Sequence, residues 1–339
     1  MLYNAKLIAA IKLQGCHAGD PAGEDTMSKT VSMILVLVLM LSLFTACGSG
    51  EIPKEGKKIV CTVFPLYDWT KNVAGEERPV SLLVKNGTDV HSFQPSAGDV
   101  AEILSADLFI YIGGESDEWV EKVLNSAGGE KVRTLCLLDA LGDRVKNEEL
   151  AEGMEGEAEE DAPDEHIWLS LENALFCTEA ICGALSESDS ANRDAYRENA
   201  DRYLETLTAL RDEYIRAASG AARETVIFAD RFPFRYLTEE MGLDYYAAFS
   251  GCSAESEASF KTVIFLAEKA DEYLLETLLV TESSDGRLAE TVKAGMKLSE
   301  PEILTLDSMQ SVTESMIENG YTYASVMKNN LAVLERALD

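Results

Sequence analysis

Two histidines of the chain stand in loops beside acidic residues, where they could bind a metal ion. Asp89 lies two residues before His91, and two acidic residues directly precede His166. Histidine is the commonest metal ligand in proteins, and a neighbouring carboxylate can fix the orientation of its ring. The third histidine, His17, lies in a segment that we expect to be absent from the mature protein. The sequence therefore predicts a metal site that contains His91 and His166.

Carboxylates follow three predicted strands in the C-terminal half of the chain. In open α/β sheets, ligands bind outside the carboxyl ends of the strands. Asp230, Glu282 and Asp307 each come directly after a short apolar run, and His91 follows such a run in the N-terminal half. Two imidazoles and two or three carboxylates would suit zinc or manganese better than copper(I) or an iron–sulfur cluster. An ion pair with Arg231 or Arg235 is the alternative role for Asp230.

The elements that would position these residues form two series of β-rich runs alternating with helical stretches, which favours an α/β fold with parallel sheets. The predicted strands are 58–64, 80–84, 108–112, 132–136, 225–229, 245–249, 278–281 and 303–306. The predicted helices are 99–105, 117–125, 170–185, 260–270, 287–296 and 321–338. A mature chain of about 290 residues suits two domains, which we place at 58–187 and 220–339.

A linking helix is predicted between the two domains, within residues 188–219. Its apolar residues recur at alternating spacings of four and three and form one seam on a charged helix. The seam consists of Tyr196, Ala200, Tyr203, Leu207, Leu210, Tyr214 and Ala217. Such a helix could run along both domains and couple them stiffly. An ordinary helix packed within one domain is the alternative.

The chain carries a formal net charge of −31, so it would repel nucleic acid and attract cations. Residues 147–165 contain ten acidic residues and no basic one, which predicts a mobile surface loop rather than a packed element. This loop could collect cations weakly near His166, or it could serve solvation alone.

The N-terminal region predicts export and lipid anchoring. Residues 31–46 form an apolar run that is short for a membrane span, preceded by Lys29 and followed by Cys47. Small residues before a cysteine are typical of a bacterial lipobox, in which Cys47 becomes the lipidated N-terminus. We therefore expect residues 1–47 to be an upstream extension plus a lipoprotein signal peptide, and residues 48–57 to be a tether. An uncleaved membrane anchor is the alternative.

Five cysteines follow Cys47, an odd number without a CxxC pair, which argues against a zinc ribbon and a dense disulfide framework. We expect most of them to be core residues, such as Cys182 on the apolar stripe of a helix. Cys252 could act as a soft metal ligand, although packing in the core or in a loop is favoured for it.

Several motifs of the chain resemble those of the zinc and manganese solute-binding lipoproteins of bacterial ABC transporters, the cluster A-I type, and the resemblance covers nearly everything after residue 57. The matching segments are Cys61–Trp69, Val73–Gly75, Gly87–Ser96, Ala106–Gly114, His166–Ser170, Tyr236–Leu243, Ala254–Ser259 and Thr305–Met309. The resemblance implies two α/β lobes bridged by a long helix. It also implies metal ligands at His91, His166 and Asp307.

The third ligand is where the chain departs from the family pattern. Arg231 lies nearest the position at which family members carry His or Glu, and arginine does not bind a cation directly. We expect Asp230 to substitute for it. The fallback candidates are Glu282, Glu255 and Glu257.

The sequence and the resemblance together predict a metal receptor without a catalytic step. We expect a monomer that is lipid-anchored at the outer face of the cytoplasmic membrane, captures one Zn²⁺ or Mn²⁺ in the cleft between the lobes, and delivers it to an ABC permease. One alternative is a receptor of the same shape for a metal chelate or another small ligand, since the chain has three tryptophans that could line a pocket. A less favoured alternative is a metallohydrolase, for which no HExxH motif is present.

Overall fold

The computed structural model describes residues 58–76, 78–126, 128–156, 162–253, 258–298 and 300–339. The predicted signal peptide, the tether and Cys47 lie outside these ranges, as do Glu255 and Glu257. Among the helices in the described ranges, none combines the length and the apolar character that crossing a membrane requires.

The N-terminal lobe is built on a four-stranded parallel sheet with the strand order β2-β1-β3-β4. Its strands are β1 (Ile59–Cys61), β2 (Val80–Leu82), β3 (Leu108–Tyr111) and β4 (Arg133–Cys136). Alternate residues of β1 enter different cores, because side chains of a strand point to opposite faces. Ile59 and Cys61 pack with α2 (Phe64–Ala74) and α6 (Leu171–Ser188), whereas Val60 packs with α3 (Ala97–Leu104) and α4 (Glu118–Leu124).

The C-terminal lobe repeats this plan with a second four-stranded parallel sheet, ordered β6-β5-β7-β8. Its strands are β5 (Thr225–Phe232), β6 (Asp244–Ser250), β7 (Thr277–Thr281) and β8 (Glu302–Leu306). One face is covered by α9 (Phe260–Glu272) and α10 (Arg287–Gly295). The other face packs against α8 (Arg235–Met241) and α12 (Tyr323–Leu338). Helices therefore cover both faces of each sheet, as parallel sheets require.

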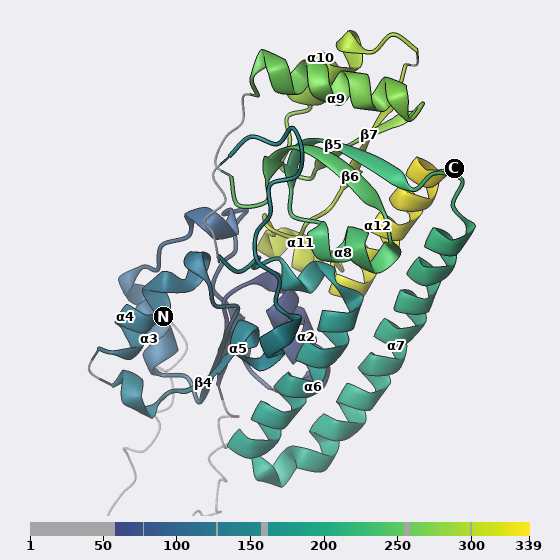
Figure 1. Ribbon diagram of the computed structural model, residues 1–339. Coiled ribbons are helices and arrows are strands. Elements are labelled where there is room, and N and C mark those ends of the chain that lie inside the picture. Colours follow the sequence, from purple (N-terminus) through teal and green to yellow (C-terminus); the bar gives the residue numbers. More distant parts are fainter. Residues whose placement is uncertain (1–57, 77, 127, 157–161, 254–257, 299) are drawn as a thin grey trace, which may run out of the picture. The chain divides into compact units, whose positions relative to one another are not determined.

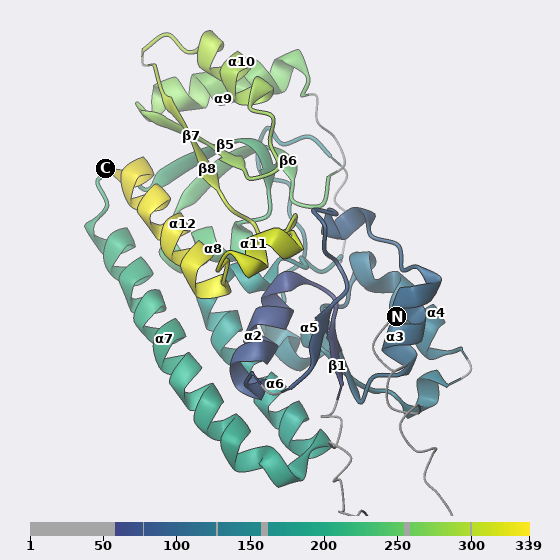
Figure 2. The same cartoon turned by 180° about the vertical axis from the view of Figure 1, so that it is seen from behind.

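The two lobes are joined by α7 (Arg193–Gly220), a helix of 28 residues that is about 42 Å long at 1.5 Å per residue. It runs beside α2 and α6 of the first lobe and beside α12 of the second (Figure 1, Figure 2). Its buried residues are Tyr196, Ala200, Tyr203, Leu207, Leu210 and Tyr214. These side chains belong to one apolar core that also contains residues of both sheets. The helix therefore fixes one lobe against the other.

The fold class predicted from the sequence is confirmed: two α/β lobes with parallel sheets are joined by a long helix. The predicted lobe boundaries stay predictions. The helix seam is buried as expected, except that Ala217 is only partly buried.

Two element predictions were wrong. The first strand ends at Cys61, and helix α2 begins at Phe64 with Pro65 in its first turn, where proline is favoured. The strand β5 continues to Phe232, so Asp230 lies inside the strand and not after it. The register of β5 against β6 shifts between Phe228 and Arg231, which lets the strand bend there. Three further short helices were not predicted: α5 (Leu137–Leu141), α8 (Arg235–Met241) and α11 (Glu314–Glu318).

The shared core predicts a large cost for truncating the seam of α7. Leu207 is fully buried in this core, whereas Ile215 on the same helix is 48% exposed. We expect Leu207→Ala to lower the free energy of unfolding by about 2–5 kcal/mol, because a buried cavity remains. Ile215→Ala should change it by less than about 1 kcal/mol. Urea denaturation of both variants measures the difference, and equal losses would contradict the shared core.

Candidate metal site

His91 is positioned by a one-turn helix, Val90–Ser92, that begins at Asp89. The Oδ1 atom of Asp89 accepts a hydrogen bond from the His91 backbone N–H at 3.0 Å. The ring is oriented by a different residue, because its Nδ1 atom lies 2.8 Å from the Oγ atom of Ser116. The neighbouring acid thus fixes the backbone of the loop, and the serine fixes the imidazole.

His166 lies directly before the turn Ile167–Leu169 and is 1% exposed. Its ring Nδ1 lies 2.8 Å from the Oδ1 atom of Asp164, and the same oxygen accepts a hydrogen bond from the His166 backbone N–H at 2.9 Å. Because a carboxylate accepts the bond, Nδ1 carries the proton and Nε2 carries a lone pair. This carboxylate–histidine pair is the arrangement that orients metal-binding histidines.

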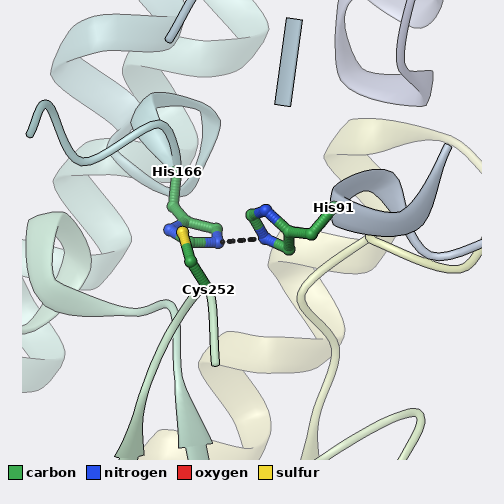
Figure 3. A group of neighbouring side chains, drawn as sticks. All are labelled: His91, His166 and Cys252. Atoms are coloured by element: carbon green, nitrogen blue, oxygen red, sulfur yellow. Dashed lines mark hydrogen bonds between the residues drawn. The ribbon is translucent and has the colours of Figure 1, made fainter. Parts of the chain in front are cut away.

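The Nε2 atoms of His91 and His166 face each other at 3.2 Å (Figure 3). The side-chain amide nitrogen of Gln310 lies 2.9 Å from the first of these atoms and 2.7 Å from the second. An amide N–H₂ group only donates, so both ring nitrogens accept and both carry lone pairs. Burial, with the neighbouring His166 ring as a further cause, lowers the pKa of His91 well below its ordinary value. The Nε2 lone pairs of the two imidazoles therefore converge at the site.

The spacing of the two nitrogens suits one shared ion. In tetrahedral zinc sites, Zn–N bonds of about 2.0–2.1 Å place two nitrogen ligands about 3.3 Å apart. The observed separation of 3.2 Å is close to this value. A cation between the rings would bind both lone pairs, which otherwise repel each other.

Cys252, in the turn that follows β6, is the third side chain of the group. Its Sγ atom and ring nitrogens of both histidines all lie within 4.8 Å of one another (Figure 3). Sequence reasoning favoured a packing role for this residue. Its proximity to the histidines could not be inferred from the sequence, because Cys252 is far from both of them along the chain.

Gln310 is a site residue that the sequence analysis missed. Its backbone N–H donates to Oε1 of Glu282 at 3.1 Å, and its Oε1 accepts from Ser308 at 3.1 Å. The available signal was its place shortly after β8, at the same edge of the sheet as the other candidates. It was overlooked because an uncharged amide is not a typical transition-metal ligand.

The predicted carboxylates have other partners. The Oδ2 atom of Asp230 accepts from the backbone N–H and the hydroxyl of Thr281, at 2.9 and 2.7 Å. Asp307 accepts from the Tyr321 hydroxyl at 2.8 and 2.9 Å, and Glu282 accepts from Ser308 at 2.8 Å. Within the described ranges, no carboxylate joins the two histidines in a ligand group of 4.8 Å spread. Metal binding by Asp230, Asp307 or Glu282 stays a prediction.

Burial perturbs the two carboxylates nearest the β8 loop. It raises the pKa of Glu282, with the charge of Asp307 as the next cause. It also raises the pKa of Asp307, although the bonds from Met309 and Tyr321 oppose the shift. Burial therefore disfavours the charged forms of both carboxylates, and a cation bound nearby would favour those forms.

Arg231, which belongs to the second lobe, stabilises the site. Its guanidinium donates to Oδ2 of Asp89 and to the hydroxyl of Ser283, both at 3.0 Å. Because Asp89 also holds the His91 backbone, this ion pair ties the loop of His91 to the strand β5. Arg231 thus has a structural role that needs no contact with the ion.

A cavity of about 460 Å³ adjoins His91 and gives a route for an ion. His91 and Cys252 line it, together with three acidic residues: Asp89, Asp230 and Asp285. Carboxylates in a cleft raise the local concentration of cations.

The acidic segment that precedes His166 makes defined contacts with the second lobe. The backbone N–H of Glu155 donates to the carbonyl of Ala248 at 2.8 Å, and Arg235 pairs with Glu149 at 2.8 Å. Glu148 and Glu149 line a small pocket with His166. We expected a mobile surface loop here, and its mobility stays a prediction.

Comparisons with known proteins agree on one family. The model of the family described as zinc-uptake complex component A, periplasmic, matches residues 59–337. The zinc-binding lipoprotein AdcA of Streptococcus pneumoniae is 32% identical over 90% of the chain, and this match covers 60% of AdcA. The chain thus spans about three fifths of the length of these AdcA relatives. The high-affinity zinc uptake system protein ZnuA of Bacillus subtilis is 27% identical over 92% of the chain and 99% of its own length.

Solved structures give the same result. The Zn(II)-bound ZnuA-like domain of AdcA from Streptococcus pneumoniae has a TM-score of 0.68 and 30% identity, covering 84% of the chain and 99% of that domain. The resemblance seen in the sequence motifs is confirmed, and the chain belongs to the zinc-uptake complex component A family of solute-binding proteins.

Proposed function

We propose that the protein is an extracytoplasmic receptor that captures one divalent transition metal, zinc in preference to manganese, and delivers it to an ABC permease. The observation that carries this proposal is the pair of Nε2 lone pairs at 3.2 Å, each oriented by a hydrogen bond on the opposite ring nitrogen. The ion is the transported substrate, and His91 and His166 are its proposed ligands.

The choice of zinc is supported by two lines of evidence. Several relatives are named for zinc, including AdcA and ZnuA, and a solved relative contains Zn(II). In addition, imidazole nitrogen suits zinc, whereas manganese favours oxygen ligands, and no described carboxylate joins the histidine pair.

Transport without catalysis is the role we assign to the site. A metallohydrolase needs an open coordination position and a general base beside it. The nearest acids are already engaged: Asp164 bonds the His166 ring, and Glu165 accepts the Ser116 backbone N–H at 2.8 Å. We further propose a monomer anchored by a lipid on Cys47 at the outer face of the cytoplasmic membrane. Relatives named as lipoproteins support this location.

Alanine variants of the two histidines test the proposal. We expect His91→Ala and His166→Ala each to weaken zinc binding by at least about 100-fold, since loss of a direct ligand should exceed the 10–100-fold effect of losing an outer partner. Isothermal titration calorimetry with zinc measures the change. Ser92→Ala in the same turn is the control and should retain affinity.

The outcomes of this titration separate the candidate functions. Unchanged zinc affinity in either histidine variant would overturn the proposal.

Native mass spectrometry of the purified wild-type chain identifies the ligand that the protein binds. A single bound zinc ion supports the receptor for free metal, and a bound organic ligand supports the alternative receptor for a chelate.

Gly251 offers a second test, because it allows the close approach of the His166 ring. A Cβ atom at this position would lie 2.7 Å from the ring Cε1 and 3.0 Å from two backbone neighbours. Gly251→Ala should therefore displace the ring and weaken zinc binding by about 10-fold or more. Gly183→Ala is the matched control, because a Cβ there meets nothing within 4 Å. Equal zinc affinities for the two glycine variants would show that the ring is not held by this contact.

A further inference from the structure

We propose that Cys252 is the third protein ligand of the ion, as a thiolate, and that the side-chain oxygen of Gln310 completes a four-coordinate site. This inference rests on the proposed function and deepens it, because it defines the transported substrate as a thiophilic divalent metal. It assigns to Cys252 the role that we predicted for Asp230 from the sequence.

The geometry of the sulfur supports this assignment. A tetrahedral zinc ion with a Zn–S bond of about 2.3 Å and Zn–N bonds of about 2.0–2.1 Å places sulfur about 3.6 Å from each nitrogen. The Sγ atom of Cys252 and the nitrogens of both histidines already lie within 4.8 Å of one another. Closing the sulfur onto an ion thus needs a movement of about 1 Å, which a turn residue can make.

Cys252 differs from the other cysteines of the described ranges. All five are free of disulfides. Cys61, Cys177 and Cys182 are buried in the shared apolar core, and the thiol of Cys136 donates to the carbonyl of Ile112 at 3.3 Å. Only Cys252 among these five joins the histidine pair. It also lines the cavity through which an ion would reach the site.

The rival third ligands are held in other bonds. Arg231 cannot bind a cation, and its guanidinium is paired with Asp89 and Ser283. The carboxylate of Asp230 accepts two bonds from Thr281 across β5 and β7. These bonds hold Asp230 against Thr281, and Asp230 does not belong to the group of possible ligands that contains both histidines, whereas Cys252 does.

Gln310 occupies the fourth position. Its amide nitrogen contacts both ring nitrogens, so the amide group lies where a ligand of the shared ion would lie. Rotation of the terminal amide exchanges its nitrogen and oxygen, and the oxygen then faces the cation. The main chain of Gln310 need not move, because its N–H stays bonded to Glu282.

Coordination replaces one bond of the thiol by another. The S–H bond breaks, a sulfur–metal bond forms, and the proton is released to solvent. No oxidant or reductant takes part, and the site gains one negative charge from the thiolate, which partly neutralises the ion.

A thiolate ligand has a consequence for selectivity. Thiolates bind zinc and similar borderline or soft ions in preference to manganese, which favours oxygen ligands. A His₂Cys site should therefore discriminate against manganese without a carboxylate in the coordination sphere.

Cobalt(II) substitution tests the inference, because cobalt reports its ligands by absorption. The full-length chain is loaded with Co²⁺, and its spectrum is compared with those of Cys252→Ser and Cys252→Ala. We expect a thiolate-to-cobalt charge-transfer band in the near ultraviolet and strong visible bands of tetrahedral cobalt in the wild type. Both variants should lose the charge-transfer band and bind zinc at least about 100-fold more weakly. Cys136→Ser is the matched control and should keep both properties.

The outcomes distinguish this inference from the proposed function. If the wild type binds zinc tightly but shows no thiolate band, and Cys252→Ser keeps its zinc affinity, the thiolate ligand is refuted while the receptor function stands. If the wild type binds neither zinc nor cobalt, the proposed function fails and the inference fails with it. Circular dichroism of each variant confirms that a lost band does not result from unfolding.

Discussion

The converging lone pairs of His91 and His166 are the interaction on which the account depends. Two ring nitrogens that carry lone pairs repel each other at 3.2 Å, and the surrounding structure holds them there through Ser116 and Asp164. The Gln310 amide offsets part of this repulsion in the metal-free protein. A cation would replace the repulsion with two coordinate bonds. The folded protein therefore holds the two nitrogens in the positions that a bound ion needs. This preorganisation lowers the entropic cost of binding the ion.

The fold explains how this geometry is maintained. The two histidines come from the first lobe, and Cys252 and Gln310 come from the second, so the site forms only if the lobes keep their relative placement. Trp168, two residues after His166, donates from its ring N–H to the carbonyl of Ser308 at 2.8 Å. Its own carbonyl accepts from the Tyr323 hydroxyl at 2.6 Å. Together with the core around α7, these bonds hold the histidines against the β8 loop of the second lobe.

Sequence patterns predicted the parts of the fold that depend on local periodicity. The apolar runs located each of the eight strands in the described part of the chain, and the seam from Tyr196 to Tyr214 located the long helix. The first strand was extended too far because the apolar run continues into α2, and only Pro65 indicates the change. The end of β5 was misplaced because the register shift near Asp230 results from pairing with β6, which leaves no local pattern.

The candidate site was predictable only in part, for a related reason. The rarity of histidine in the mature chain and its place in loops pointed to His91 and His166, and the structure brings these two together. Position along the chain did not predict the contacts of Arg231. Its side chain contacts Asp89 instead of the histidines. Cys252 and Gln310 are distant in sequence from both histidines, and only the packing of β6 and β8 brings them near.

X-ray absorption at the zinc edge of the zinc-loaded protein tests most directly that both imidazoles share one ion. The account predicts two imidazole rings per zinc, with nitrogens at about 2.0–2.1 Å and one sulfur at about 2.3 Å. A spectrum with one imidazole or none per zinc ion would contradict it.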